Sequence, residues 1–112
     1  MTLRPAELPE HYFPAVRDRD IDRFMALFAA DALMILPDGQ EVAGAEAIRE
    51  AELRVFASGG PVPQPTSITV GENSVAVEID VHLPGGRVMK AANFYQLNAD
   101  GLIQRLSTYR KV

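Results

Sequence analysis

The sequence contains no cysteine, no tryptophan and only two histidines among its 112 residues. Without cysteine there are no disulfide bonds, no thiolate nucleophiles and no thiolate metal ligands, although the redox compartment stays open. Two histidines are a poor basis for a metal site, because the common structural and catalytic sites draw on several histidine and cysteine ligands. We therefore expect no metal in this protein.

Positive charge is also scarce. Lysine and arginine number 11 against 15 aspartates and glutamates, which gives a net charge of −4. The arginines are scattered among acids, so no basic surface is available to hold phosphates, and we expect no nucleic acid partner. The sequence has no apolar run of about 18 residues that could span a membrane, and its first residues lack a signal-peptide core. We expect no membrane contact and a cytoplasmic location.

Hydrophobic residues make up 47% of the chain and charged residues 23%, which is typical of a globular protein with a buried core. A chain of this length is expected to form a single domain over residues 1–112. Helical patterns fill the first half and strand patterns the second. This segregation predicts an α+β fold.

Three helices are expected. Tyr12, Phe13 and Val16 would form one face of the first, with a nearby proline starting or kinking it. A second is predicted by an apolar spacing of three and four residues over 21–28, behind Asp20 as N-cap. A third would begin at Gly44 and run to about residue 58. Its inward residues are expected to be Ile48, Val55 and Phe56.

Strands are predicted at 32–36, where an apolar run meets a Pro-Asp-Gly turn, and at 67–70, 74–83, 88–97 and 102–110. A proline-rich connection precedes residue 67. The last four strands would form a curved antiparallel meander. Glu78, Asp80 and Lys90 are expected on its outer face, with opposite charges facing each other across strands.

The register of one hairpin decides where Asn93 lies. A three-residue loop over 84–86 would pair Val77 with Asn93, Ile79 with Ala91 and Val81 with Met89, all on the inner face. A two-residue or four-residue loop would turn the strand over, because side-chain direction alternates with a period of two. We favour the inward arrangement, which keeps the apolar residues together.

The chain resembles the nuclear transport factor 2-like superfamily, which includes ketosteroid isomerases and SnoaL-like polyketide cyclases. Three segments carry the resemblance: Asp20-Ile21 with 28–32 (FAADA), 44–50 (GAEAIRE) and 98–103 (NADGLI). It covers nearly the whole chain. It implies a cone in which a curved antiparallel sheet wraps around about three N-terminal helices, as in cystatin-like folds. It also implies a pocket for a small apolar organic ligand, no cofactor, and a homodimer through the outer sheet face.

The resemblance assigns roles to particular residues. Tyr12 and Asn93 match positions where ketosteroid isomerases place hydrogen-bond donors to a developing enolate oxygen. Leu36 stands where those enzymes carry the aspartate that moves the proton. Asp38 is the nearest substitute base, although its Pro-Asp-Gly context favours an ordinary turn.

The last strand departs from the family as well. SnoaL-like cyclases tend to carry a histidine and an aspartate where this chain has Leu106 and Thr108. Arg110 could pair with an anionic ligand group or extend into solvent. The residues expected to line the pocket are Met34, Leu36, Phe56, Val77, Ile79, Met89, Tyr95, Leu106, Thr108 and Arg110, although most would equally suit a plain core.

Three functions remain open from sequence. The first is a cofactor-independent isomerase or cyclase that polarises a carbonyl with Tyr12 and Asn93, a role that for Tyr12 competes with that of a core tyrosine bonded to the backbone. The second is a module that binds a small molecule without chemistry. The third is a scaffold that dimerises through its outer sheet face, and a filled pocket would favour it.

Overall fold

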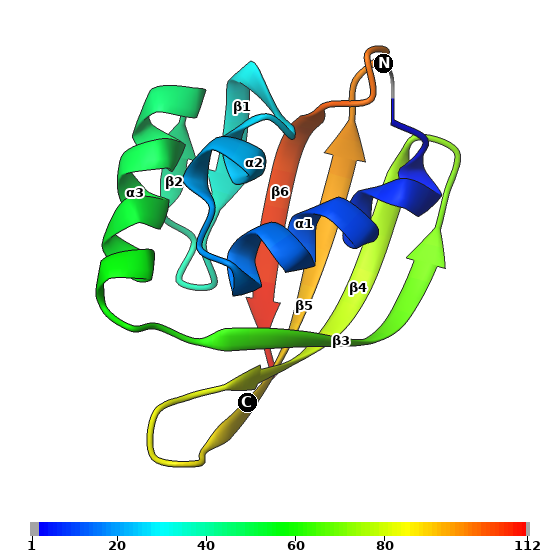
Figure 1. Cartoon of the computed structure of the whole chain (residues 1–112). Helices are drawn as coiled ribbons and strands as arrows, with labels where there is room; N and C mark the ends of the chain where they lie inside the picture. Colours follow the sequence, from blue (N-terminus) through cyan, green and yellow to red (C-terminus); the bar gives the residue numbers. More distant parts are fainter. Residues whose placement is uncertain (1–2, 112) are drawn as a thin grey trace.

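The computed structural model describes residues 3–111, which form a six-stranded sheet with helices packed on one face (Figure 1). This arrangement confirms the expected α+β class. The 3-10 turn Pro5–Glu7 leads into the first helix, and the elements are α1 (Leu8–Arg17), α2 (Ile21–Met25), β1 (Phe28–Ile35), β2 (Glu41–Ala43), α3 (Ala45–Ala57), β3 (Val62–Val70), β4 (Ser74–His82), β5 (Val88–Leu97) and β6 (Ile103–Arg110).

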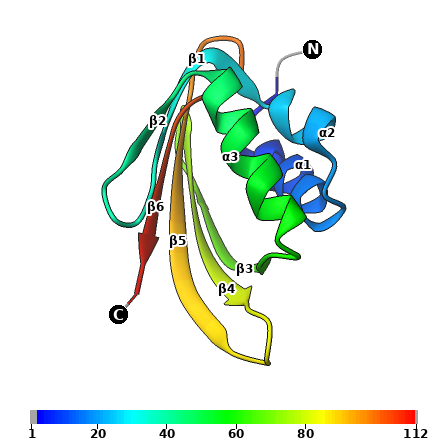
Figure 2. The same ribbon diagram turned by 90° about the vertical axis from the view of Figure 1, so that its left-hand side faces the viewer.

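The sheet order is β2-β1-β6-β5-β4-β3, and β3 to β6 form the expected antiparallel meander. β1 pairs parallel with β6. Parallel neighbours need a long connection, and the chain between β1 and β6 is long enough to bring β6 back in the same direction as β1. Register shifts interrupt the β1–β6, β3–β4 and β5–β6 pairings. Such bulges increase bending, and the sheet curves strongly around the helices (Figure 2).

The β4–β5 hairpin adopts the predicted register. Val77 lies opposite Asn93, Ile79 opposite Ala91 and Val81 opposite Met89. Gly85 and Gly86 form the turn, and both have positive φ angles. A residue with a side chain would be strained in this backbone conformation. Asn93 is consequently only 6% exposed on the helix-facing side of the sheet.

The second helix is shorter than the sequence predicts. Asp20 caps it as expected, accepting a hydrogen bond from the Arg23 amide at 3.2 Å. However, α2 ends at Met25, and Phe28 begins β1 opposite Ile103. The Phe28 ring still packs 5.0 Å from that of Phe24, so the contact that suggested helical spacing forms after the chain has left the helix.

The third strand is longer than predicted, because β3 begins within the proline-rich segment. Pro63 pairs with Val81 and Pro65 with Ile79. β3 is an edge strand, and two prolines spaced by two residues place their missing N–H groups on the same, unpaired side. The expectation of a connection up to residue 67 was therefore wrong.

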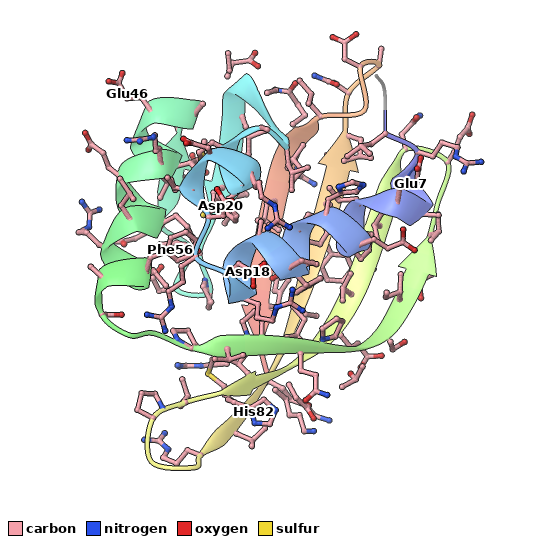
Figure 3. All side chains as sticks on the ribbon, viewed as in Figure 1. Glu7, Asp18, Asp20, Glu46, Phe56 and His82 are labelled. Carbon is pink, nitrogen blue, oxygen red and sulfur yellow. The ribbon has the colours of Figure 1, made fainter. Side chains whose placement is uncertain are left out.

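The core lies between the helices and the inner sheet face. Ile48 of α3 and Phe24 of α2 are fully buried, whereas Val55, expected inward, is 38% exposed. Phe56 lies on the side of α3 that faces α2 (Figure 3), and its ring centroid is 6.1 Å from that of Phe24. The rotation of α3 about its axis therefore buries Ile48 and leaves Val55 at the edge of the packed face, partly in solvent. Among residues 3–111, no helix has the length and apolar character needed to cross a membrane.

Candidate functional site

A cavity of about 210 Å³ opens between the helices and the inner sheet face. α1 and α3 form one side of it, and β4, β5 and β6 form the other. Its wall consists of Tyr12, Phe13, Val16, Pro37, Glu52, Val55, Pro61, Pro63, Ile79, Val81, Met89, Ala91, Asn93, Thr108 and Arg110. Most of these side chains are apolar, and the few polar groups come from both sides.

A fixed carboxamide lies in the sheet side of this wall. The Thr108 hydroxyl donates to Asn93 Oδ1 at 2.9 Å, and Asn93 Nδ2 donates to the Tyr95 hydroxyl at 2.9 Å. A primary amide has two N–H donors, and this bond uses one of them. Tyr95 from the same strand and Thr108 from the neighbouring β6 therefore orient Asn93 while leaving it a second donor.

Two tyrosines extend this polar group toward α1. Their rings, Tyr12 from α1 and Tyr95 from β5, meet edge to face with centroids 5.0 Å apart. Burial raises the pKa of Tyr12 well above its usual value, and the nearby Tyr95 and Glu52 raise it further. Burial likewise raises the pKa of Tyr95. Both phenols therefore stay protonated at neutral pH and can serve as hydrogen-bond donors.

Glu52 is the carboxyl group in the cavity wall, and our sequence analysis did not identify it. It lies half-buried on α3, across the cavity from the sheet strands. Burial raises its pKa from 4.5 to about 7. None of the five ion pairs found within residues 3–111 includes Glu52, so no cation offsets the effect of burial on its carboxyl. At neutral pH, Glu52 is therefore balanced between its acidic and basic forms.

Helical spacing could have located Glu52. It lies four residues after Ile48 and four before Phe56, so all three occupy one face of α3. The apolar residues of this face dominated the sequence interpretation. A carboxyl within such a face is the signal that was overlooked.

The expected substitute base, Asp38, does not reach the cavity. Its carboxylate accepts a hydrogen bond from the Gln40 amide at 3.0 Å, which is the turn arrangement that the sequence favoured. Asp38 and Leu36 instead border a separate surface hollow with Pro37 and Arg110. Asp38 is exposed, and Leu36 packs partly against the core.

The remaining expected site residues divide into two groups. Ile79, Met89, Thr108 and Arg110 line the cavity with Tyr12 and Asn93. Met34, Val77, Tyr95 and Leu106 are buried in the core, and Phe56 packs on Phe24. Tyr95 still acts on the cavity through its bond with Asn93.

Within residues 3–111, no three histidine, aspartate or glutamate side chains are arranged to hold a metal ion. Arg110 is exposed at the edge of both the cavity and the neighbouring hollow, so its guanidinium borders the solvent.

The outer sheet face carries a second feature. Phe94 and Tyr109 are 48% and 59% exposed there, and their rings pack edge to face at 5.5 Å. A broad hollow of about 700 Å³ adjoins them. Asp80 and Lys90 pair across β4 and β5 at 2.6 Å, as predicted for the outer face.

Solved structures with this fold are numerous. A candidate ketosteroid isomerase from Kribbella flavida is 22% identical, with a TM-score of 0.88 over 99% of this chain and 80% of its own. A candidate polyketide cyclase from Sinorhizobium meliloti is 24% identical, with a TM-score of 0.81 over 91% and 93%. The epoxide hydrolase/cyclase-like enzyme SalBIII of salinomycin pyran-ring formation is 19% identical, with a TM-score of 0.83 over 96% and 91%.

These similarities establish the nuclear transport factor 2-like, cystatin-like fold that the sequence predicted. No curated protein matches the sequence significantly. The model of the SnoaL-like domain matches residues 10–106, which is most of the chain. Together with the cone of helices and curved sheet, this match shows that the protein belongs to the SnoaL-like domain family.

Proposed function

We propose that this protein binds a small apolar organic ligand in the cavity and polarises a carbonyl oxygen of that ligand with Asn93 and Tyr12. The reaction class is a cofactor-independent isomerisation or cyclisation through an enolate. The 112 residues act as one SnoaL-like domain. The expected cytoplasmic location remains a prediction.

One observation carries this proposal: Asn93 is a fixed carboxamide in the wall of a largely apolar cavity. An unpaired amide in such surroundings costs about 1–3 kcal/mol, so its placement calls for hydrogen-bond partners. Thr108 and Tyr95 supply two of them. The second N–H is suited to a ligand oxygen, and in a water-poor site such a donor favours the form that carries developing negative charge.

The proposal is tested by titrating substituted phenols, whose phenolate oxygen resembles an enolate, while recording amide chemical shifts. Wild type should bind them saturably, with shifts on α1, α3 and the inner face of β5. Asn93→Leu and Tyr12→Phe should each weaken binding about tenfold or more, because a lost hydrogen bond to a charged group is worth about 1.5–3 kcal/mol.

Two variants serve as matched controls. Asn73→Leu repeats the amide substitution at an exposed turn, and Tyr109→Phe removes an exposed hydroxyl from the outer face. Both should bind like wild type. Absence of phenol binding by the wild-type protein, or binding equally strong in Asn93→Leu and Tyr12→Phe, would contradict the proposal.

A second candidate is a non-catalytic small-molecule carrier. The apolar residues Leu36 and Leu106 at the family's acid–base positions favour it. A carrier would bind apolar ligands through the same cavity with little dependence on the Asn93 donor. Phenol binding that tracks ring size and ignores ionisation and Asn93 would support the carrier.

We also propose that the chain forms a homodimer through the outer sheet face. Support comes from the exposed Phe94 and Tyr109 rings and from Val88, which is 50% exposed on the same face. Large exposed apolar patches commonly mark association sites.

A further inference from the structure

We propose that Glu52 is the catalytic residue that transfers the proton, replacing the absent carboxylate at Leu36, and that its substrates are uncharged, single-ring or short-chain ketones. This inference rests on the function proposed above. It assigns the base to α3, a helix that our sequence analysis had treated only as packing.

Geometry singles out Glu52. Among the residues that line the cavity in the described part of the chain, it supplies the one carboxyl group. It projects from the helix side, whereas Asn93 and Thr108 belong to the sheet side. A ligand held between these sides would have its oxygen at the amide and a carbon facing the carboxylate.

In the part of the chain that the structure describes, no positively charged side chain pairs with Glu52, so its carboxylate is free to accept a proton. Tyr12 from α1 and Tyr95 from β5 are the titratable groups that its charge influences directly. Arg110 from β6 lines the same cavity, but its exposed guanidinium forms no ion pair with Glu52. The Arg19 guanidinium contacts α3 by donating to the Phe56 carbonyl at 3.2 Å.

The step balances without a co-reactant. The Glu52 carboxylate removes a proton from the carbon next to the carbonyl, and the C–H electron pair becomes the enolate double bond. The carbonyl oxygen gains the charge, which Asn93 and Tyr12 stabilise by donating hydrogen bonds. In a ketone whose C=C bond lies between the β and γ carbons, the enolate is a dienolate, and Glu52 returns the same proton to the γ carbon. The C=C bond moves into conjugation with the carbonyl, so that the net change is an isomerisation.

Cavity size limits the substrate. The space is about 210 Å³, and an apolar cavity of about 150 Å³ is sufficient for benzene. A single ring with a small substituent therefore fits inside the cavity, whereas most of a four-ring steroid would extend beyond its mouth. A carboxylate substrate would meet Glu52 at close range, which favours uncharged ligands.

The experiment measures deuterium exchange at the carbons beside the carbonyl of cyclohexanone, and isomerisation of 3-cyclohexenone to 2-cyclohexenone, by proton NMR. Glu52→Gln should lower both rates about 10²–10⁴-fold, the usual contribution of a positioned base. Wild-type rates should rise with pH through about 7, following the carboxylate form. Phenol binding should survive in Glu52→Gln, because the donors remain.

The matched control is Glu50→Gln, on the same helix at an exposed position. It should exchange protons like wild type. Wild-type exchange that persists in Glu52→Gln would overturn the role of Glu52 while leaving the proposed function standing. Phenol binding without any wild-type exchange would also overturn it and favour the carrier, and absence of both binding and exchange would overturn the two proposals together.

Discussion

Glu52 lies where burial disfavours its charged form, so the same residue should lower stability at alkaline pH. Its pKa is about 7 in the folded chain and 4.5 for the unperturbed carboxyl. Between these values the folded state binds more protons than the unfolded state, so the free energy of unfolding falls as pH rises. Above pH 7 the loss is complete and should reach on the order of 2 kcal/mol for this partly buried group.

We therefore predict that Glu52→Gln is more stable than wild type at pH 8 by on the order of 2 kcal/mol, and that the difference shrinks toward pH 5. Urea unfolding at a series of pH values measures this. Glu50→Gln, an exposed change of equal charge, should follow the wild-type curve. A constant difference between Glu52→Gln and wild type across this range would show that burial does not perturb the Glu52 carboxyl.

At the scale of elements, the stability of the short helix α2 depends on its N-cap, Asp20. The helix has only five residues, too few to be stable alone, and it carries the fully buried Phe24. That ring packs 5.3 Å from Tyr12, 5.0 Å from Phe28 and 6.1 Å from Phe56. The start of α2 thus helps to position two of the helices around the cavity.

Asp20→Ala should lower the free energy of unfolding by about 1 kcal/mol, because it removes the acceptor for the Arg23 amide. Denaturant unfolding at neutral pH measures the loss. Asp22→Ala changes an exposed aspartate in the first turn of the same helix and should cost less. Equal losses in the two variants would indicate a general charge effect in place of capping.

For the whole molecule, the prediction concerns association. Two copies joined through the outer face would cover Phe94 and Tyr109, and stable interfaces bury about 800 Å² per partner. Sedimentation velocity of wild type should show a dimer at micromolar concentration. Phe94→Glu and Tyr109→Glu should each shift the protein toward monomer, because a charge would be buried at the interface without a partner.

Leu53→Glu is the control for association, because Leu53 is a partly exposed apolar residue on α3, away from the outer face. It should leave the dimer intact. A wild-type monomer at all concentrations, or a dimer that persists in both outer-face variants, would contradict the proposed interface. Circular dichroism of each variant verifies that the substitutions leave the sheet folded.

The sequence by itself determined those features whose physical cause is local. Alternation of apolar and polar residues over 74–82 favoured the loop register over 84–86 that places Asn93 on the inner face of the sheet, and the structure confirms that register. The aspartate that caps α2 and the glycine that precedes α3 were readable for the same reason, since capping involves residues only a few positions apart. The hydrogen bond of Asp38 within its Pro-Asp-Gly turn is another such local feature.

Tertiary structure decided whatever depends on distant partners. Pro63 and Pro65 can belong to a strand only because β3 is at the sheet edge, and Phe28 leaves the helical pattern because its strand pairs with Ile103. The perturbed protonation equilibrium of Glu52 arises in the same way. Its raised pKa comes from burial, and packing of α3 over the curved sheet creates that burial from residues far apart in the chain.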